Sequence, residues 1–325
     1  MEKNRIVEHQ LTISEGDLNI FAVRFNSDDS YLAAACSDGT VRIYSSSTGN
    51  PTRVLNSRIS PDLMPVTSVR WRPVSALAKT KNVLIATTAD GGILHWHATS
   101  GKSLHTITLR ENQVLSSDYN PDGSKFAVGC KDSCVRIYDE STKQVAAELN
   151  QGEGERLRHA NRVCALKWVN PNTLISAGFD NNVLLWDLRS ERVARYIHGP
   201  HICGDSIDVR GNVLLTGSYH IKDQLQLWSL LDGQNICTQT VRSEDQRSCQ
   251  LYAAQFSKFD GGESIAIGGS GSDEAYFYDS ESYKRFAVLT NMSRAAYSID
   301  FANTDNRVAV GCGDGSIRIF SIKDE

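Results

Sequence analysis

The residues of this chain that could do chemistry fall into three groups, and the first has the side chains of a hydrolase. His159, Ser176 and Asp180 supply an imidazole, a hydroxyl and a carboxylate, which together can activate a serine nucleophile. A serine nucleophile needs a sharp, exposed turn, and GxSxG is the usual signature of that turn. Ser176 instead lies within ISAGF, an apolar segment typical of the middle of a β-strand. We therefore predict no catalytic residue, and the chain is not expected to be an enzyme.

The other two groups could bind a ligand. His95 and His97 flank Trp96, and alternate residues of a strand share a face, so the pair could ligate a metal. No further Cys, Asp or Glu stands at a ligand-like spacing nearby, which favours a surface strand with two histidines. The segment GGSGSDE, from Gly268, lacks the Lys-Ser/Thr pair and the helix of a phosphate loop, so we interpret it as a turn. The sequence thus predicts no metal and no cofactor.

The composition is that of a globular protein of 325 residues, with 40% hydrophobic and 22% charged residues. A formal charge of −4 argues against general nucleic-acid binding, and no apolar stretch is long enough to span a membrane. The N-terminal sequence MEKNRIVEHQ has charges where a secretory signal needs an apolar run. Eight cysteines are scattered without a CxxC pair. We expect reduced cysteines and an intracellular protein, in the cytoplasm, the nucleus or both.

One pattern repeats seven times: an apolar strand, a turn with Asp, and a second apolar strand that ends in an aromatic residue. These aromatic residues are 42 to 52 residues apart, and they are Tyr44, Trp96, Tyr138, Trp186, Trp228, Tyr278 and Phe320. Alternating segments such as VTSVRW and VCALKW precede the repeats, and polar turns separate them. Short strands at regular spacing predict a sandwich, a barrel or a propeller, and the sevenfold repeat favours the propeller.

The repeats resemble those of the WD-repeat family over nearly the whole chain. The resemblance implies an all-β, seven-bladed β-propeller with four-stranded antiparallel blades. It also implies that four residues of the best-matching repeat form a structural hydrogen-bonded tetrad: His159, Ser176, Asp180 and Trp186. In other repeats the serine is replaced by Ala34, Ala86, Val128 or Val310. Those blades are expected to depend on packing instead.

The two ends of the sequence indicate how the ring closes. The last repeat ends at Phe320, with only SIKDE after it, so this repeat lacks an outer strand. The N-terminal segment RIVEHQLTI alternates like a strand, and in WD-repeat propellers the N-terminal strand completes the last blade. We expect residues 1–325 to form one propeller domain in which residues 1–13 supply this strand. Closure leaves only short, protected sheet edges.

The resemblance also indicates where a partner would bind. In WD-repeat proteins the narrow top face is the commonest docking surface, and particular positions of each blade point into it. Among these positions, the aromatic and charged residues are Phe21, Lys131, Arg162, Phe179, Asp205, Tyr252 and Tyr297. Tyr and Arg are enriched at interface hot spots. Polar insertions at 56–65, 150–160 and 241–250 are expected to rim the same face, although each could equally be a solvated spacer.

The function that follows is that of a non-catalytic scaffold or adaptor, which docks a peptide or a partner domain on the top face. The alternative is a permanent subunit of a large assembly, such as a cytoskeletal, axonemal, coat or ubiquitin-ligase complex, that uses its blade edges or bottom face. Other proteins or peptides are the expected partners. We expect no general nucleic-acid binding, no membrane insertion and no small-molecule substrate.

Overall fold

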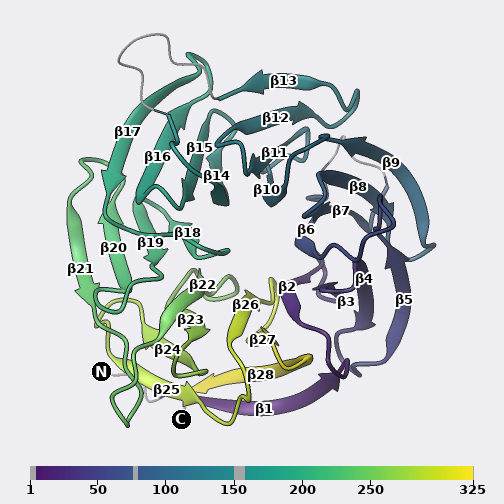
Figure 1. The fold of residues 1–325 in the computed structure, drawn as a ribbon. Coiled ribbons are helices and arrows are strands. Elements are labelled where there is room, and N and C mark those ends of the chain that lie inside the picture. Colours follow the sequence, from purple (N-terminus) through teal and green to yellow (C-terminus); the bar gives the residue numbers. More distant parts are fainter. Residues whose placement is uncertain (1–4, 76–79, 150–157, 325) are drawn as a thin grey trace.

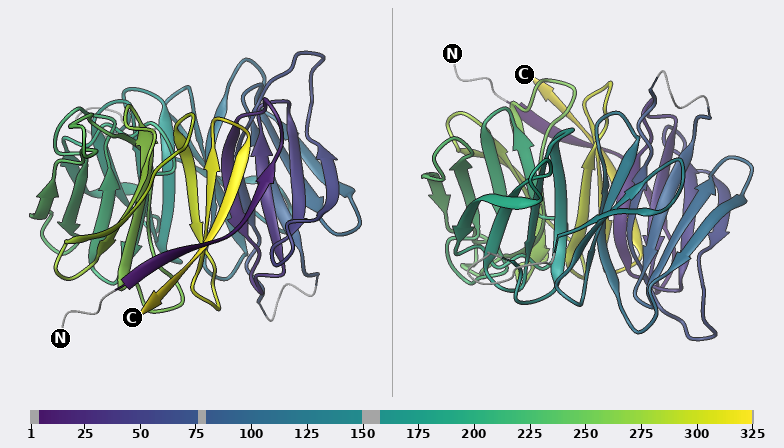
Figure 2. Two further views of the ribbon diagram at one scale, coloured as in Figure 1. Left: turned by 90° about the horizontal axis from the view of Figure 1, so that it is seen from below. Right: turned by 90° about the horizontal axis from the view of Figure 1, so that it is seen from above.

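The computed structural model describes residues 5–75, 80–149 and 158–324 of the chain. These residues form 28 β-strands and no helix. The strands make seven antiparallel sheets of four strands, arranged as blades around a central channel (Figure 1). The prediction of a seven-bladed β-propeller is therefore confirmed. Figure 2 shows the same ring from its edge, as a disc whose blades stand side by side.

Each blade runs outward from the channel in chain order, except the last. Blade 1 comprises β2 (Ile20–Phe25), β3 (Tyr31–Cys36), β4 (Thr40–Ser45) and β5 (Pro51–Asn56). Blade 2 comprises β6 (Val66–Trp71), β7 (Val83–Thr88), β8 (Gly92–His97) and β9 (Lys102–Thr108). Blade 3 comprises β10 (Val114–Tyr119), β11 (Lys125–Cys130), β12 (Val135–Asp139) and β13 (Val145–Glu148). Blade 4 comprises β14 (Val163–Asn170), β15 (Thr173–Gly178), β16 (Asn182–Asp187) and β17 (Arg192–His198).

The remaining three blades complete the circle. Blade 5 comprises β18 (Ile207–Arg210), β19 (Val213–Gly217), β20 (Leu225–Ser229) and β21 (Asn235–Gln239). Blade 6 comprises β22 (Gln250–Phe256), β23 (Ser264–Ser270), β24 (Ala275–Asp279) and β25 (Arg285–Leu289). Blade 7 comprises β26 (Ala296–Phe301), β27 (Arg307–Cys312), β28 (Ser316–Asp324) and, as its outer strand, β1 (Arg5–Ser14).

The N-terminal strand closes the ring, as the fold prediction requires. β1 pairs antiparallel with β28, from Arg5 opposite Asp324 to Ser14 opposite Ser316 (Figures 1 and 2). The buried Arg5 guanidinium also reaches blade 6, where its Nη1 donates to the carbonyl oxygen of Glu263 at 2.9 Å. On the other side of blade 7, Asp29 of blade 1 accepts hydrogen bonds of 2.7 Å from the backbone and the hydroxyl of Thr304. Closure thus uses pairing within one sheet and polar links to both neighbouring blades.

The hydrophobic core lies between the blades. Seven clusters of buried apolar residues occupy the seven junctions between neighbouring blades. The repeated aromatic residues lie on the third strand of each blade, and Tyr44, Tyr138 and Trp186 among them are at most 3% exposed. The sequence period of 42 to 52 residues therefore corresponds to one blade and one packed junction.

Two local interpretations of the sequence are wrong. His95 does not lie on a surface strand, because it is fully buried at the junction of blades 2 and 3, with its Nε2 3.2 Å from a carboxylate oxygen of Glu140. The glycine-rich segment is not wholly a turn, because Gly268 and Gly269 belong to β23. A Cβ atom on Gly269 would lie 1.9 Å from the carbonyl oxygen of Gln250. Close approach of the backbone of β22, and not turn geometry, explains the glycine at that position.

Candidate protein-binding site

The candidate site is formed by a β-bulge that recurs near the start of the inner strand in six blades. In six blades the register between the first and second strands shifts near the start of the inner strand, which leaves one extra residue there. A β-bulge of this kind redirects a side chain. The side chains of all six bulge residues line one cavity: Phe21, Thr67, Leu115, Cys164, Tyr252 and Tyr297. In blade 5 the corresponding position is Asp205, which precedes β18 and lines the same cavity.

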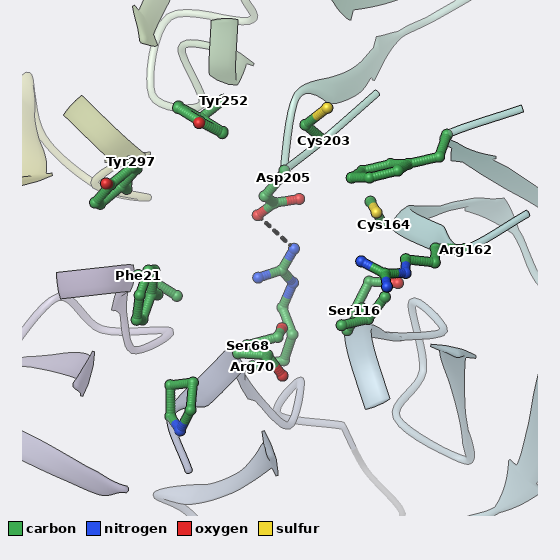
Figure 3. Close-up of a pocket in the computed structure, with 16 residues that line it drawn as sticks. Phe21, Ser68, Arg70, Ser116, Arg162, Cys164, Cys203, Asp205, Tyr252 and Tyr297 are labelled. Carbon is green, nitrogen blue, oxygen red and sulfur yellow. Dashed lines mark hydrogen bonds and ion pairs between the residues drawn. The ribbon is translucent and has the colours of Figure 1, made fainter. Parts of the chain in front are cut away.

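This central cavity has a volume of about 330 Å³ and lies at the end of the channel where the inner strands begin. Its floor is an ion pair that spans the channel (Figure 3). Nη2 of Arg70, from blade 2, lies 2.6 Å from Oδ2 of Asp205, and Arg24 of blade 1 pairs with the same carboxylate. Arg70 also lies 3.5 Å from a carboxylate oxygen of Asp118. Paired charged side chains therefore close the cavity at its inner end.

One side of the cavity is aromatic. Phe21, Tyr297 and Tyr252 line the cavity on this side, and Tyr219 continues their row outside the lining; across blades 1, 7, 6 and 5 the successive ring centroids are 5.4, 5.1 and 5.0 Å apart. We call these four residues the aromatic arc. All four are partly exposed, and burial together with the Tyr219 hydroxyl raises the pKa of Tyr252. The arc thus offers neutral rings that a partner can contact, with hydroxyl groups as directional donors.

The opposite side carries a cation. The guanidinium of Arg162 lies over the ring of Phe179, 5.7 Å from its centroid, and both side chains are partly exposed. Figure 3 shows Arg162 and Cys164 across the cavity from Phe21, Tyr252 and Tyr297. Arg162 precedes the bulge of β14 and faces Gly178, where a Cβ atom would lie 1.9 Å from the Arg162 carbonyl oxygen. Glycine at position 178 therefore allows the close backbone approach that places Arg162 here.

The structure brings six of the seven predicted partner-binding residues into the lining of the cavity. The six are Phe21, Arg162, Phe179, Asp205, Tyr252 and Tyr297. Lys131 is exposed and lies outside the lining, since it follows β11 on the surface. Asp205 does not project freely, because two guanidinium groups hold its carboxylate in the floor.

Sequence reasoning missed Arg70 and Tyr219. The sequence did contain a signal for Arg70. In each of the seven alternating segments that form the inner strands, the penultimate residue is polar or charged, and in the structure it faces the channel. These residues are Arg24, Arg70, Asp118, Lys167, Asp208, Gln255 and Asp300. Tyr219 lies in the longer turn of blade 5 and packs on Tyr252 of blade 6, a contact that follows only from the packing of these neighbouring blades.

Two of the three predicted rim insertions lie against turns of neighbouring blades. In the first, the Ser60 hydroxyl donates to Asp90 at 2.8 Å, and exposed Leu63 and Met64 lead into Pro65 of the cavity lining. In the third, Nη1 of Arg247 donates to the carbonyl oxygen of Gly271 at 3.2 Å. Residues 150–157 of the second insertion lie outside the described residues.

The four tetrad residues form one hydrogen-bonded chain inside blade 4. Nε1 of Trp186 donates to Oγ of Ser176 at 2.7 Å, and Oγ lies 2.7 Å from Nε2 of His159. Nδ1 of His159 lies 2.8 Å from the carboxylate of Asp180. Because the Asp180 carboxylate can only accept, Nδ1 of His159 carries the proton, and Nε2 of the neutral ring then accepts from the Ser176 hydroxyl. Ser176 is fully buried, which leaves its oxygen inaccessible to a substrate.

Among residues 5–75, 80–149 and 158–324, no group of three or more His, Cys, Asp or Glu side chains is arranged to hold a metal ion. Over the same ranges, no helix has the length and apolar character needed to cross a membrane. All eight cysteines are unpaired, and burial raises the pKa of Cys164 and Cys203 in the cavity to about 12.

Comparison with known proteins identifies the family. The model described as "WD domain, G-beta repeat" matches residues 8–45 and 286–321, and that described as "Anaphase-promoting complex subunit 4 WD40 domain" matches residues 81–171. Together with the seven-bladed ring and its repeats, these matches show that the chain belongs to the WD-repeat family of β-propellers. The resemblance seen in the sequence is confirmed.

Similar proteins come from several organisms. The cell division cycle 20.1 protein of Arabidopsis thaliana, a "cofactor of APC complex", is 26% identical over 58% of this chain and 41% of its own length. Human coronin-2A is 30% identical over 52% of this chain and 33% of its own length. The meiotic fizzy-related protein 1 of Schizosaccharomyces pombe is 23% identical over 79% of this chain and 57% of its own length. The chain thus spans less than two thirds of these relatives.

Proposed function

We propose that this protein is a non-catalytic scaffold or adaptor that docks a peptide or a domain of another protein in the central cavity. The observation that carries the proposal is the convergence of bulge residues from six blades, with Asp205 of the seventh, on one partly exposed cavity. A rigid ring that presents aromatic rings and a guanidinium has the residue types of an interface hot spot. The first insertion, which leads into Pro65 of the cavity lining, adds contact surface.

The relatives support this class of function. One is described as a cofactor of the APC complex, which is a role played by contact with other proteins. Our proposal extends such a role to this chain and adds that residues 1–325 form one propeller domain in an intracellular protein. Because the chain matches only part of each relative, a partner is not carried over from any of them.

A second candidate, permanent incorporation into a large assembly through the blade edges, is favoured by a different observation. The outer strands of five consecutive blades each expose one large apolar side chain, at 45 to 60%: Val54, Leu104, Val145, Tyr196 and Ile236. Outer strands also present unpaired backbone groups that another chain could use. These side chains are separated along the rim and do not form one cavity, so we rank this candidate second.

Capture of partners by purified variants separates the two candidates. The wild-type chain and the Arg162→Ala/Tyr252→Ala variant are used as baits in extract of the native organism, and cross-linked residues are mapped by mass spectrometry. A Val54→Ser/Leu104→Ser variant is the matched control at the blade edge. The proposal expects cross-links around the cavity and loss of the partner only with the first variant. Loss only with the edge variant would overturn it in favour of the assembly subunit.

A further inference from the structure

The charges of the channel below the cavity cancel. Four cations, Arg24, Arg70, Lys167 and Lys258, are matched by four carboxylates, Asp118, Asp205, Asp208 and Asp300. The pairs are close: Nζ of Lys167 lies 2.7 Å from Asp208, and Nζ of Lys258 lies 2.8 Å from Asp300. The floor therefore presents no net charge to a ligand above it.

Arg162, in contrast to these channel cations, is not paired with a carboxylate of the described residues. In the described part of the chain its guanidinium makes a contact with the ring of Phe179 and no ion pair. Among the described residues, Asp205 is the single carboxylate that lines the cavity, and Arg24 and Arg70 already share it. Counted over residues 5–75, 80–149 and 158–324, the cavity thus holds one unbalanced positive charge, at its side, between partly apolar walls. A charge in such surroundings interacts more strongly with an opposite charge than it would in open water.

Phe21, Tyr297 and Tyr252 of the aromatic arc lie across the cavity from this charge (Figure 3). Resting on the proposed docking function, we infer that the docked segment carries an aromatic or branched apolar side chain with an Asp or Glu close to it in sequence. The apolar side chain packs on Phe21, Tyr297 and Tyr252. The carboxylate accepts hydrogen bonds from Arg162, whose planar guanidinium can bind it with two parallel donors.

Neither a basic segment nor a purely apolar segment fits the cavity. A lysine or arginine of the partner would enter beside Arg162 and above Arg70, and its natural acceptor, Asp205, is occupied. A purely apolar segment would cover Arg162 and remove its water without supplying an acceptor. Burial of an unpaired charge costs free energy, so such a segment is disfavoured relative to an acidic one.

Selection of peptides on the whole chain tests the inference. A displayed library of random twelve-residue peptides is selected on the wild-type protein, with Tyr252→Ala as the counter-selection target. We expect the enriched peptides to combine an aromatic, Leu or Ile residue with an Asp or Glu within about four positions, a distance that an extended segment can span across the cavity. An enriched set without acidic preference, or with a basic one, would overturn the inference and leave the docking function standing.

A synthetic peptide from the enriched set then measures the role of Arg162. Replacing its acidic residue by the amide should weaken binding to the wild-type chain about tenfold or more, the size expected of a charged hydrogen bond. The same change should have little effect on the Arg162→Ala variant, whereas Arg192→Ala, an exposed arginine of β17, should behave like wild type. Equal binding of acid and amide peptides to the wild type would contradict the inference.

Failure of the docking function itself has a different signature. If no peptide distinguishes the wild-type chain from Tyr252→Ala, the cavity does not dock segments and both proposals fall. If peptides do distinguish them, a charge exchange is decisive: Arg162→Glu should lose the acidic peptide and gain affinity for the version in which Lys replaces the acid. The melting temperature of each variant shows that it is folded, as expected for partly exposed positions.

Discussion

Arg70 reaches Asp205 across the channel: the two residues are 135 positions apart in the chain and belong to blades on different sides of the ring, yet Nη2 and Oδ2 are separated by 2.6 Å. The same carboxylate also receives Arg24. This contact converts an open channel into a cavity with a floor, and it ties the position of blade 2 to that of blade 5. It requires blades 2 and 5 to face each other across the channel.

The first prediction concerns this floor. Asp205→Ala leaves Arg24 and Arg70 without their shared acceptor, and we expect the free energy of unfolding to fall by about 1–3 kcal/mol. The loss is smaller than for a fully buried pair because the Asp205 side chain is 24% exposed. Urea denaturation measures the difference. As a matched control, Asp187→Ala removes a solvent-facing pair with Arg189 and should leave the urea midpoint almost unchanged; equal effects of the two substitutions would refute the structural role of Asp205.

The tetrad should make blade 4 sensitive to substitution. Trp186→Ala removes a large buried ring and is expected to cost about 3–5 kcal/mol of unfolding free energy. Asp180→Ala should cost about 1–3 kcal/mol, since His159 and the amide of Ala160 lose their acceptor. Trp186→Phe keeps most of the packing and serves as the control for the indole donor. If Asp180→Ala unfolds at the same urea concentration as the wild type, the hydrogen-bonded chain contributes nothing to stability.

Closure of the ring gives the third prediction. Deletion of residues 1–13 removes nearly all of β1 and the Arg5 links to blade 6, and it leaves β28 as an unpaired edge. The truncated chain should melt at a clearly lower temperature and aggregate more readily. Arg5→Ala, which keeps the strand pairing, should have a smaller effect in the same direction. A truncated chain that melts with the full chain would show that β1 is dispensable for closure.

The fourth prediction is a loss of stability in acid. Burial of Asp300 alone would raise its pKa, but Lys258 and Arg24 outweigh burial and hold the pKa below its ordinary value of 3.8. The pKa of Asp180 is likewise lowered, with burial outweighed by the hydrogen bond from His159. Because both groups bind a proton less readily in the folded state, their stabilisation is present above about pH 4 and is lost as the pH falls below it.

Unfolding free energies measured from pH 7 down to pH 2.5 check this sign. Below pH 4, the unfolding free energy should fall more steeply with decreasing pH for the wild type than for Asp300→Asn. The variant has no carboxylate at this position that could gain a proton. Parallel curves for the two proteins would show that Asp300 does not contribute to acid unfolding.

The fold was readable from the sequence because its signal is repeated. Seven aromatic residues at a regular spacing, each ending a third strand, define seven blades even where Ala34 or Val310 replaces the tetrad serine. The cavity residues Phe21, Tyr252 and Tyr297 were readable for the same reason, since each stands one place after the first apolar residue of its inner strand.

What the sequence did not reveal depends on contacts between blades. His95 meets Glu140 of the next blade, and Arg70 meets Asp205 three blades away, so neither environment is visible in local spacing. Lys131 occupies an expected position, but it lies on the exposed surface beyond the bulge residues and does not line the cavity. Local pattern thus predicts which residue faces the cavity and does not predict which residue from another blade it meets.

Docking of a partner in the cavity formed by the bulge residues can be measured directly. The most direct measurement is the dissociation constant of the partner captured by the wild-type chain, determined by titration calorimetry for the wild type and for Arg162→Ala/Tyr252→Ala. We expect the double substitution to abolish measurable binding while the melting temperature stays within a few degrees of the wild type, because hot-spot residues dominate an interface and both positions are partly exposed. An unchanged dissociation constant in a folded double variant would contradict this expectation.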